Sequence, residues 1–263
     1  MAEKAADTVV IEATNLTKDR LSSFLRKPTR VLDGLNLKVM QGQTYGLLGP
    51  NGAGKTTTIK LLLGLLKADS GELKVLGEAA GSPTGLAKIG FLPENPYFYT
   101  HLTGREFLTF VGQLFNLPTA TISTRVKELL ERVSLSSAAD QAMGKYSKGM
   151  LQRLGIAQAL INDPLLLFLD EPMSGLDPIG RMEVRKILKE LKSEGKTVFF
   201  NSHLMADVGE LCDQVGVLVG GKLVADRPLA SISSTGNFKD LEEFFLEQVN
   251  LQQSSVGKIA EGS

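Results

Sequence analysis

The chain has 263 residues, in which 29 lysines and arginines balance 29 aspartates and glutamates, so its formal net charge is zero. This balance argues against a protein that holds nucleic acid by an overall positive charge, and a hydrophobic content of 43% excludes a largely disordered chain. The length suits one large domain or two small ones, and the single cysteine, Cys212, cannot form an internal disulfide. No apolar run approaches the ~20 residues of a membrane span, and residues 1–7 lack the apolar core of a signal peptide. We therefore expect a soluble, cytoplasmic chain.

Short apolar runs alternate with amphipathic helical patterns, which is typical of an α/β fold with a largely parallel sheet. The first clear strand is predicted at residues 44–48. A helix is predicted after it, because apolar side chains recur at helical spacing from Ile59 to Leu66 and form one buried stripe.

Between this strand and this helix, residues 49–56 read GPNGAGKT and match the pattern G-x-x-x-x-G-K-[ST] in full. Glycines let successive backbone N–H groups face phosphate oxygens, and the following helix adds its positive N-terminal end. Lys55 is expected to reach the β- and γ-phosphates, and Thr56 to offer its hydroxyl to Mg²⁺. Thr57 is either a donor to the α-phosphate or an ordinary polar residue at a helix start. The predicted nucleotide-binding residues of this loop, the P-loop, are Asn51, Gly52, Gly54, Lys55, Thr56 and Thr57.

The middle of the chain, from residue 93 to 163, shows helix periodicity and no convincing strand. One apolar stripe runs from Ile122 to Val133, and a second runs from Met150 to Ile161. This pattern predicts a helical insertion that interrupts the α/β core.

Two carboxylates follow the next apolar run, residues 165–169, which we interpret as a central strand buried on both faces. Asp170 and Glu171 would then lie at the carboxyl edge of the sheet, where open α/β folds bind their ligands. We expect Asp170 to hold Mg²⁺ through water and Glu171 to orient and deprotonate an attacking water. A solvated pair of acids at a strand end is the alternative interpretation.

The rest of the chain continues the α/β pattern. A helix is predicted from Val184 to Leu191, a strand at 197–200, and a hairpin at 214–224 around two glycines. After residue 228 the chain becomes polar, with a short amphipathic helix from Leu241 to Val249, and residues 252–263 resemble a frayed end.

These elements predict a P-loop NTPase core with a mixed, largely parallel sheet, an inserted helical subdomain and a short C-terminal helix. The expected boundaries are 1–92 for the first part of the core and 93–163 for the helical subdomain. Residues 164–228 form the second part of the core, and 229–263 form a C-terminal extension.

Three further segments bear on function. Residues 146–153 read YSKGMLQR and are similar to the signature L-S-G-G-Q-x-Q-R, and residues 174–177 read SGLD, a D-loop pattern. His203 follows the strand predicted at 197–200, at the position of a switch histidine. With the P-loop and the acidic strand, these segments resemble the nucleotide-binding subunit of ATP-binding-cassette (ABC) transporters, over roughly residues 8–225.

The resemblance implies that two subunits enclose two ATP molecules head to tail. Ser147 would cap the signature helix and donate to the γ-phosphate held by the other subunit, and Gly149 would let the backbone approach it. His203 would contact the γ-phosphate, although an ordinary histidine at a helix start is the alternative. Asp177 would couple the two sites.

Two positions depart from the family pattern. Glu94, in the segment FLPENP, stands where the Q-loop normally has glutamine, and we expect it to sense Mg²⁺ and the attacking water. Lys148 and Met150 replace glycine and glutamine in the signature. Together these departures are similar to a branch of the family whose membrane partners are often exporters of the ABC-2 type.

The residue that stacks on adenine is not settled by the sequence. The family often has a tyrosine near residue 20, where this chain has Arg20, and the only aromatic residue before position 45 is Phe24. Either Phe24 or Arg20 could stack on the base, the latter by a cation–π contact, and a core role for Phe24 is a further alternative.

An aromatic cluster at Tyr97, Phe98 and Tyr99 follows Glu94. It is either part of the helical subdomain's core or a docking groove, which in the family receives a helix of the membrane subunit. The resemblance implies a second ATPase subunit and a transmembrane permease as partners, a peripheral position on the cytoplasmic face of the membrane, and no nucleic acid.

The sequence therefore predicts an ATP- and Mg²⁺-dependent ATPase subunit of an ABC transporter, most consistent with export. One alternative is an ABC ATPase without a membrane partner, acting on DNA, ribosomes or cofactor assembly. The other is a regulatory module that binds ATP without turnover, against which the intact Glu171 and His203 argue.

Overall fold

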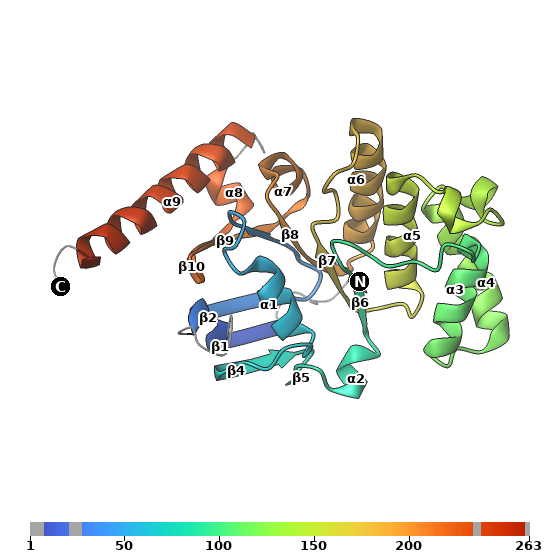
Figure 1. The fold of residues 1–263 in the computed structure, drawn as a ribbon, viewed down its shortest axis with the longest axis horizontal. Coiled ribbons are helices and arrows are strands. Elements are labelled where there is room, and N and C mark those ends of the chain that lie inside the picture. The colour runs from blue at the N-terminus through green and yellow to red at the C-terminus, as the bar shows by residue number, and fades with distance from the viewer. Residues whose placement is uncertain (1–7, 21–27, 234–237, 261–263) are drawn as a thin grey trace, which may run out of the picture. The chain divides into compact units, whose positions relative to one another are not determined.

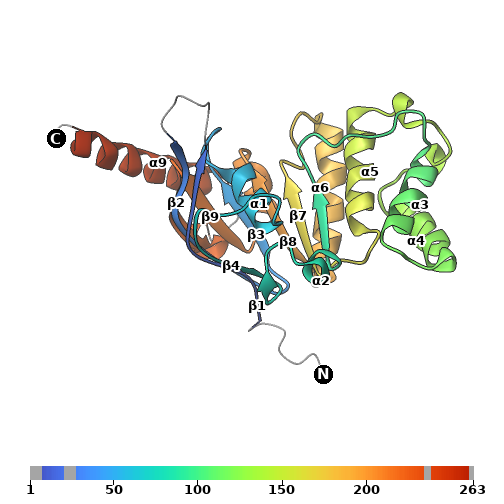
Figure 2. The same ribbon diagram turned by 60° about the horizontal axis from the view of Figure 1, so that its bottom comes forward.

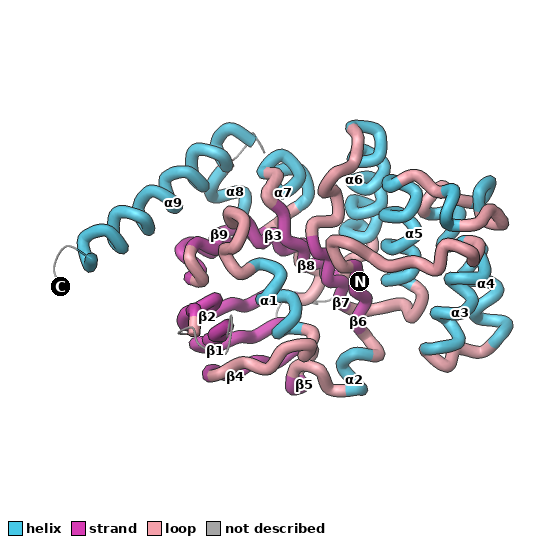
Figure 3. Tube along the Cα trace, viewed as in Figure 1, coloured by secondary structure: helices cyan, strands magenta, loops and turns pink. Residues whose placement is uncertain are grey.

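The computed structural model describes residues 8–20, 28–233 and 238–260, so Phe24 lies outside the described residues. The chain divides into two units: Met1–Ser82 with Asn201–Ser263, called unit one, and Pro83–Phe200, called unit two. Helices and strands occur in both (Figures 1 and 3). The α/β class predicted from the sequence is confirmed, whereas the predicted boundaries at residues 92, 163 and 228 stay a prediction.

Unit one contains an antiparallel sheet that the sequence analysis did not predict. Its strands, in the order β2-β1-β4-β5, are Thr29–Met40, Val9–Arg20, Ser70–Val75 and Glu78–Ala79 (Figure 2). Along β2, Leu35, Leu37 and Val39 are buried while the residues between them are exposed. This two-residue period is the signal that predicts a half-buried strand.

The part of unit one that carries the P-loop is built on a parallel pair of strands. Strand β3, Thr44–Leu48, is buried along its whole length and pairs with β9, Gln214–Val219, which forms a hairpin with β10, Lys222–Pro228. Helix α1, Lys55–Leu62, starts where the P-loop ends. Ile59 is buried as expected, but Leu66 is 37% exposed because the helix has already ended.

The C-terminal helices complete unit one. They are α7, Met205–Leu211, α8, Leu229–Ile232, and α9, Phe238–Ala260. The first turns of α9 contact α7 and β9 and bury Leu241, and its later turns extend beyond these elements (Figures 1 and 2). The prediction of a frayed end from residue 252 was wrong, since the helix continues to Ala260.

Unit two has three strands in the order β8-β7-β6, with β6 and β7 parallel. They are β6, Ile89–Leu92, β7, Leu166–Asp170, and β8, Thr197–Ser202, which runs two residues past the boundary of the unit. The strand predicted at 165–169 is confirmed with a shift of one residue, since Leu165 is half exposed and lies outside β7.

Helices make up the rest of unit two. They are α2, Pro83–Leu86, α3, Gly104–Leu114, α4, Thr119–Arg132, α5, Lys148–Leu160, and α6, Pro178–Ser193, with single 3₁₀ turns at Ser136–Ala138 and Met143–Lys145. The helical insertion is confirmed. Helices α5 and α6 lie side by side, and α3 and α4 lie on the other side of α5 (Figures 1 and 2).

Arg153 joins α5 to its neighbours. It is 8% exposed, its guanidinium donates to the backbone oxygen of Val133 at 2.8 Å, and its Nε lies 3.3 Å from a carboxylate oxygen of Glu183 on α6. A buried charge needs partners of this kind to offset its loss of hydration. Arg153 therefore ties the signature helix to α6.

A polar cluster lies at the start of β3, at the opposite end of the strand from the P-loop. The fully buried Tyr45 donates its hydroxyl to Oδ1 of Asp226 at 3.2 Å, and Nε2 of Gln214 donates to the same oxygen at 2.7 Å. Burial raises the pKa of the Asp226 carboxyl, and the two hydrogen bonds only partly oppose this. The ionised form of Asp226 is thus less favourable in the folded chain than in the unfolded chain.

We expect Asp226→Asn to stabilise the protein at neutral pH, by up to about 1 kcal/mol, because the amide oxygen still accepts both hydrogen bonds and carries no charge. In the wild type the stability contributed by Asp226 is fully present below the ordinary aspartate pKa and is lost as pH rises through the raised pKa. The difference in the free energy of unfolding between variant and wild type should therefore grow as pH rises from the ordinary aspartate pKa through the raised pKa. Urea unfolding at several pH values measures this difference. A variant less stable than the wild type at pH 7 would contradict this account.

Candidate functional site

The P-loop lies in unit one between β3 and α1. Lys55 is 7% exposed, and its ammonium donates to the backbone oxygens of Gly49 at 2.7 Å and Pro50 at 3.3 Å. Its side chain therefore folds back along the inside of the loop. This places a cation within the ring of backbone groups that the motif is expected to form around phosphates.

Two glycines set the backbone of the loop. Gly52 has φ +81° and nothing within 4 Å of the place where a Cβ would stand, so this side of the loop is open. Gly54 has φ +110°, and a Cβ there would lie 2.8 Å from a methyl group of Leu32 and 2.9 Å from the backbone oxygen of Val31. Only glycine fits at position 54, both for its conformation and for space.

Three threonines begin α1 and have different surroundings. Thr58 is fully buried and donates its hydroxyl to the backbone oxygen of Gly54 at 3.0 Å, so it has a structural role. Thr56 is half-buried, and Thr57 lines a pocket beside the helix. The hydroxyl of Thr56 is at the position expected to meet Mg²⁺, and that of Thr57 is at the position expected to meet the α-phosphate.

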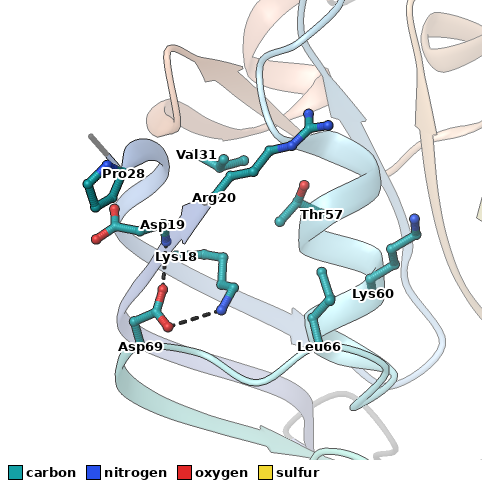
Figure 4. Close-up of a pocket in the computed structure, with 9 residues that line it drawn as sticks. All are labelled: Lys18, Asp19, Arg20, Pro28, Val31, Thr57, Lys60, Leu66 and Asp69. Carbon is teal, nitrogen blue, oxygen red and sulfur yellow. Dashed lines mark hydrogen bonds and ion pairs between the residues drawn. The ribbon is translucent and has the colours of Figure 1, made fainter. Parts of the chain in front are cut away.

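The pocket beside Thr57 has a volume of about 770 Å³ (Figure 4). Arg20 extends across it toward the side of α1 that carries Thr57, with Val31 nearby. It is lined by Lys18, Asp19, Arg20, Pro28, Val31, Thr57, Lys60, Leu66 and Asp69. Five of these nine residues are charged, and the volume lies within the range of small-molecule sites.

The charges in this pocket are partly paired. Asp69 accepts the backbone N–H of Asp19 at 2.6 Å and lies 3.0 Å from the ammonium of Lys18, and these two contacts lower its pKa. Asp69 thus stays ionised and balances Lys18. The other cations of the lining are Arg20 and Lys60, both of them exposed.

The two predicted carboxylates lie at the end of β7 in unit two. Asp170 is the last residue of the strand and is 3% exposed, and Glu171, which follows it, is 7% exposed. Glu171 has φ +50°, a left-handed conformation that costs a residue with a Cβ about 1 kcal/mol or more. Because both side chains are almost fully buried, a solvated pair of acids is a poor description of these residues.

The signature and the D-loop come together in unit two. Ser147 caps α5, where its hydroxyl accepts the N–H of Met150 at 3.2 Å, and Asp177 caps α6, where its carboxylate accepts the N–H of Gly180 at 2.7 Å. A Cβ on Gly149 would lie 3.9 Å from Cα of Gly180. The N-termini of the two helices are therefore neighbours.

The remaining predicted residues are exposed. Glu94 lies two residues after β6 in unit two, and His203 directly follows β8 and belongs to unit one. The predicted site is therefore divided: the P-loop residues and His203 belong to unit one. Glu94, Ser147, Gly149, Asp170, Glu171 and Asp177 belong to unit two.

The aromatic cluster at 97–99 is divided between core and surface, and its docking role stays a prediction. Phe98 packs edge-to-face on Phe107, with ring centroids 5.2 Å apart, and so belongs to the core. Tyr97 is 98% exposed and Tyr99 is 55% exposed. Their neighbours on α3 extend this surface, and the set Tyr97, Tyr99, Phe110 and Leu114 is called the aromatic face below.

Sequence reasoning missed Phe110 and Leu114. They lie one turn apart on α3, outside the stripe of buried residues of that helix. Apolar residues on the face of an amphipathic helix that should be polar are the signal that could have identified them. Within the described part of the chain, no helix is both long and apolar enough to span a bilayer.

Comparison with known proteins identifies the family. Residues 32–174 match the family described as ABC transporter. An uncharacterized ABC transporter ATP-binding protein of Nostoc sp. is 46% identical over 239 residues, which cover 90% of this chain and 71% of the relative. A fluoroquinolones export ATP-binding protein of Mycobacterium tuberculosis is 46% identical over 198 residues, covering 74% of this chain and 64% of the relative.

A solved structure agrees with the sequence comparisons. The structure described as the ATP-binding subunit of an ABC transporter aligns with a TM-score of 0.77 at 28% identity, covering 91% of this chain and 99% of that one. The matched relatives are longer than this chain, which spans about two thirds to three quarters of their length. The fold, the P-loop and the matched family lead to one conclusion: the chain is an ATP-binding subunit that belongs to the ABC transporter family.

Proposed function

We propose that this chain binds and hydrolyses ATP as the motor subunit of an ABC exporter. The observation that carries the proposal is Glu171, a buried and conformationally strained carboxylate that directly follows Asp170 at the end of β7. Export is supported by the relative whose name describes fluoroquinolones export.

Nucleotide binding falls to unit one. The backbone N–H groups around Gly52 and the ammonium of Lys55 bind the β- and γ-phosphates, and the N-terminus of α1 adds its partial positive charge. Asn51, Gly54 and Thr57 complete the phosphate-binding loop. The open side of Gly52 leaves room for the phosphates to approach the backbone.

The donor groups fit Mg²⁺, which prefers hydroxyl, carboxylate and water oxygens. Thr56 offers a hydroxyl on the first turn of α1, Asp170 offers a carboxylate that is 3% exposed, and Glu94 offers an exposed carboxylate in place of an amide. When bound, the ion neutralises charge that develops on the phosphates. Thr56 and Asp170 are the residues that would hold the ion.

Glu171 accepts a proton from the attacking water as that water forms a bond to the γ-phosphorus, the bond from the γ-phosphorus to the β,γ-bridging oxygen breaks, and ADP leaves. Its left-handed backbone restricts the directions in which its side chain can extend from the end of β7. His203 stabilises the γ-phosphate from the loop after β8. The two residues have different roles: Glu171 accepts the proton, and His203 holds the γ-phosphoryl group that is transferred to water.

A second copy of the chain completes the site. Ser147 and Gly149, at the N-terminus of α5, meet the γ-phosphate that the other copy's P-loop holds, and Asp177 links the two sites. The closeness of the N-termini of α5 and α6 supports this, since both elements can face one partner surface.

The aromatic face is the surface for a membrane-embedded permease, which places the chain at the cytoplasmic side of the membrane. An exposed apolar set of this size on one helix and the preceding loop is unusual for a surface that only meets water. It suits a short amphipathic helix of the permease. No nucleic acid is involved, in keeping with a net charge of zero.

Arg20 is the residue that stacks on adenine. It lies at the pocket beside Thr57, so a base placed there continues from an α-phosphate bound at the start of α1. A guanidinium plane stacks well on an aromatic base. The pocket volume, about 770 Å³, leaves room for the base together with its ribose.

We expect Glu171→Gln to bind ATP normally, to lose at least about 100-fold in turnover, and to trap an ATP-bound dimer, because the amide cannot accept the proton. Phosphate release measures turnover, and size-exclusion chromatography with ATP measures the dimer. Glu190→Gln, on the far part of α6, is the control and should keep full turnover. Turnover in Glu171→Gln equal to that of the wild type would refute the role of Glu171.

We expect Arg20→Ala to weaken ATP binding about 2- to 30-fold, the range of a cation–π contact. Binding of inorganic triphosphate, which has no base, should not change, and Arg20→Tyr should restore the affinity for ATP. Calorimetric titration of both ligands measures this. Equal losses for ATP and triphosphate would show instead that Arg20 acts on the phosphates.

We expect the tagged full chain to co-purify from detergent extracts with a multi-span membrane protein, and the double variant Tyr97→Ser/Leu114→Ser to lose it while keeping its ATP turnover. Leu246→Ser, at an exposed apolar residue on α9, is the control that should retain the partner. Recovery of the wild type without any membrane protein in several detergents would contradict the transport function and favour an ABC ATPase that acts elsewhere.

A further inference from the structure

The turn of the β9–β10 hairpin packs against the P-loop in unit one. Gly220 and Gly221 lie between the two strands, and both have left-handed backbones, with φ +55° and +81°. A two-residue hairpin turn of type I′ requires this conformation at both positions. Hairpin geometry thus accounts for the two left-handed residues but not for the contacts that the turn makes with other segments.

Two backbone hydrogen bonds connect Gly221 to two other segments. Its N–H donates to the backbone oxygen of Ala53 in the P-loop at 3.2 Å, and its carbonyl oxygen accepts the N–H of Asp33 on β2 at 2.9 Å. The next residue, Lys222, lies 3.3 Å from a carboxylate oxygen of Asp33. A single residue of the turn therefore joins the P-loop to β2.

The same segments pack too closely for a side chain at position 221. Gly221 is buried, and a Cβ there would overlap the backbone oxygen of Val31 and lie 3.1 Å from Cα of Leu32. The same oxygen of Val31 lies 2.9 Å from the place where a Cβ would stand on Gly54. A glycine of the turn and a glycine of the P-loop thus contact one carbonyl group. These are main-chain atoms of a paired strand, which cannot move aside as the end of a flexible side chain can.

Strand β9, which leads into the turn, supports the other end of the P-loop. It pairs with β3 up to Leu48, and a Cβ on Gly49 would overlap the backbone oxygen of Leu218. The P-loop is therefore held by β9 where it begins and by Gly221 at Ala53, two residues before α1 starts at Lys55.

We propose that Gly221 is a positioning residue for nucleotide binding, which holds the P-loop at Ala53 so that the start of α1 meets the phosphates in one fixed geometry. The proposal rests on the proposed function, in which the P-loop binds the phosphates of ATP. Gly221 acts through Ala53 and Gly54, and its role does not require contact with the nucleotide.

The test compares Gly221→Ala with Gly220→Ala in the full chain. Gly220 is the matched control, because it is the other residue of the same turn, has a left-handed backbone and has nothing within 4 Å of a Cβ. The control measures the strain of alanine in a left-handed turn, about 2–4 °C in the unfolding midpoint, without a collision. Its Kd for inorganic triphosphate should equal that of the wild type.

We expect Gly221→Ala to raise the Kd for inorganic triphosphate and the Kd for ATP by the same factor, about tenfold, because a displaced P-loop misplaces the groups that bind the phosphates. Calorimetric titration below the unfolding midpoints of both variants measures this. A residue with only a structural role would lower the midpoint and leave both Kd values unchanged. The equal effect on the two ligands distinguishes Gly221 from Arg20, whose substitution should affect ATP alone.

A measurement on the wild type tests the proposal even if Gly221→Ala does not fold. Saturating triphosphate should slow hydrogen exchange of the Gly221 amide at least about tenfold, because binding fixes the loop that supplies its acceptor. The control is the amide of Gly195, which donates to the backbone oxygen of Lys192 in unit two and should slow by a smaller factor. NMR spectroscopy follows both amides in one sample.

Two results would overturn the proposal. One is a triphosphate Kd of Gly221→Ala that equals that of Gly220→Ala. The other is exchange of the Gly221 amide that slows no more than that of Gly195 on binding. If the wild type binds neither triphosphate nor ATP, the proposed function fails together with the positioning role. If the wild type and Gly221→Ala bind both ligands equally well, only the positioning role fails.

Discussion

The end of each buried parallel strand is the constraint on which the rest of the site depends. In a strand buried on both faces, the backbone N–H and C=O groups form hydrogen bonds with the neighbouring strands. Where the chain turns at the carboxyl end of the strand, its backbone N–H and C=O groups need other hydrogen-bond partners. In unit one β3 ends in the P-loop, where the buried ammonium of Lys55 donates to the backbone oxygens of Gly49 and Pro50. In unit two β7 ends in Asp170 and Glu171, and the turn forces Glu171 into a left-handed conformation. The predicted site residues Lys55, Asp170 and Glu171 lie at these two turns and are almost fully buried there.

A net charge of zero does not prevent strong local charge, because positive and negative side chains are concentrated in different segments of the chain. The P-loop places one buried lysine among backbone dipoles, and the end of β7 places two buried carboxylates side by side. Away from the site the same charge types form structural pairs, such as Arg153 with Glu183. Burial strengthens the electrostatic interactions in each of these arrangements, since a charge removed from water interacts more strongly with the protein groups around it.

The sequence predicted the parts of the fold that one strong local pattern specifies. The P-loop, β3, β7, α6 and the β9–β10 hairpin were found because each combines a buried run with a glycine or a charged residue at its end. The antiparallel sheet of unit one was missed, since its strands are half-buried and one-sided, and a two-residue period over a few residues is a weak signal. The end of α9 was misjudged because its polar residues were taken as a sign of fraying, whereas the helix continues through them. The division of the aromatic cluster, with Phe98 in the core and Tyr97 at the surface, depends on the tertiary position of α3 and has no local signal.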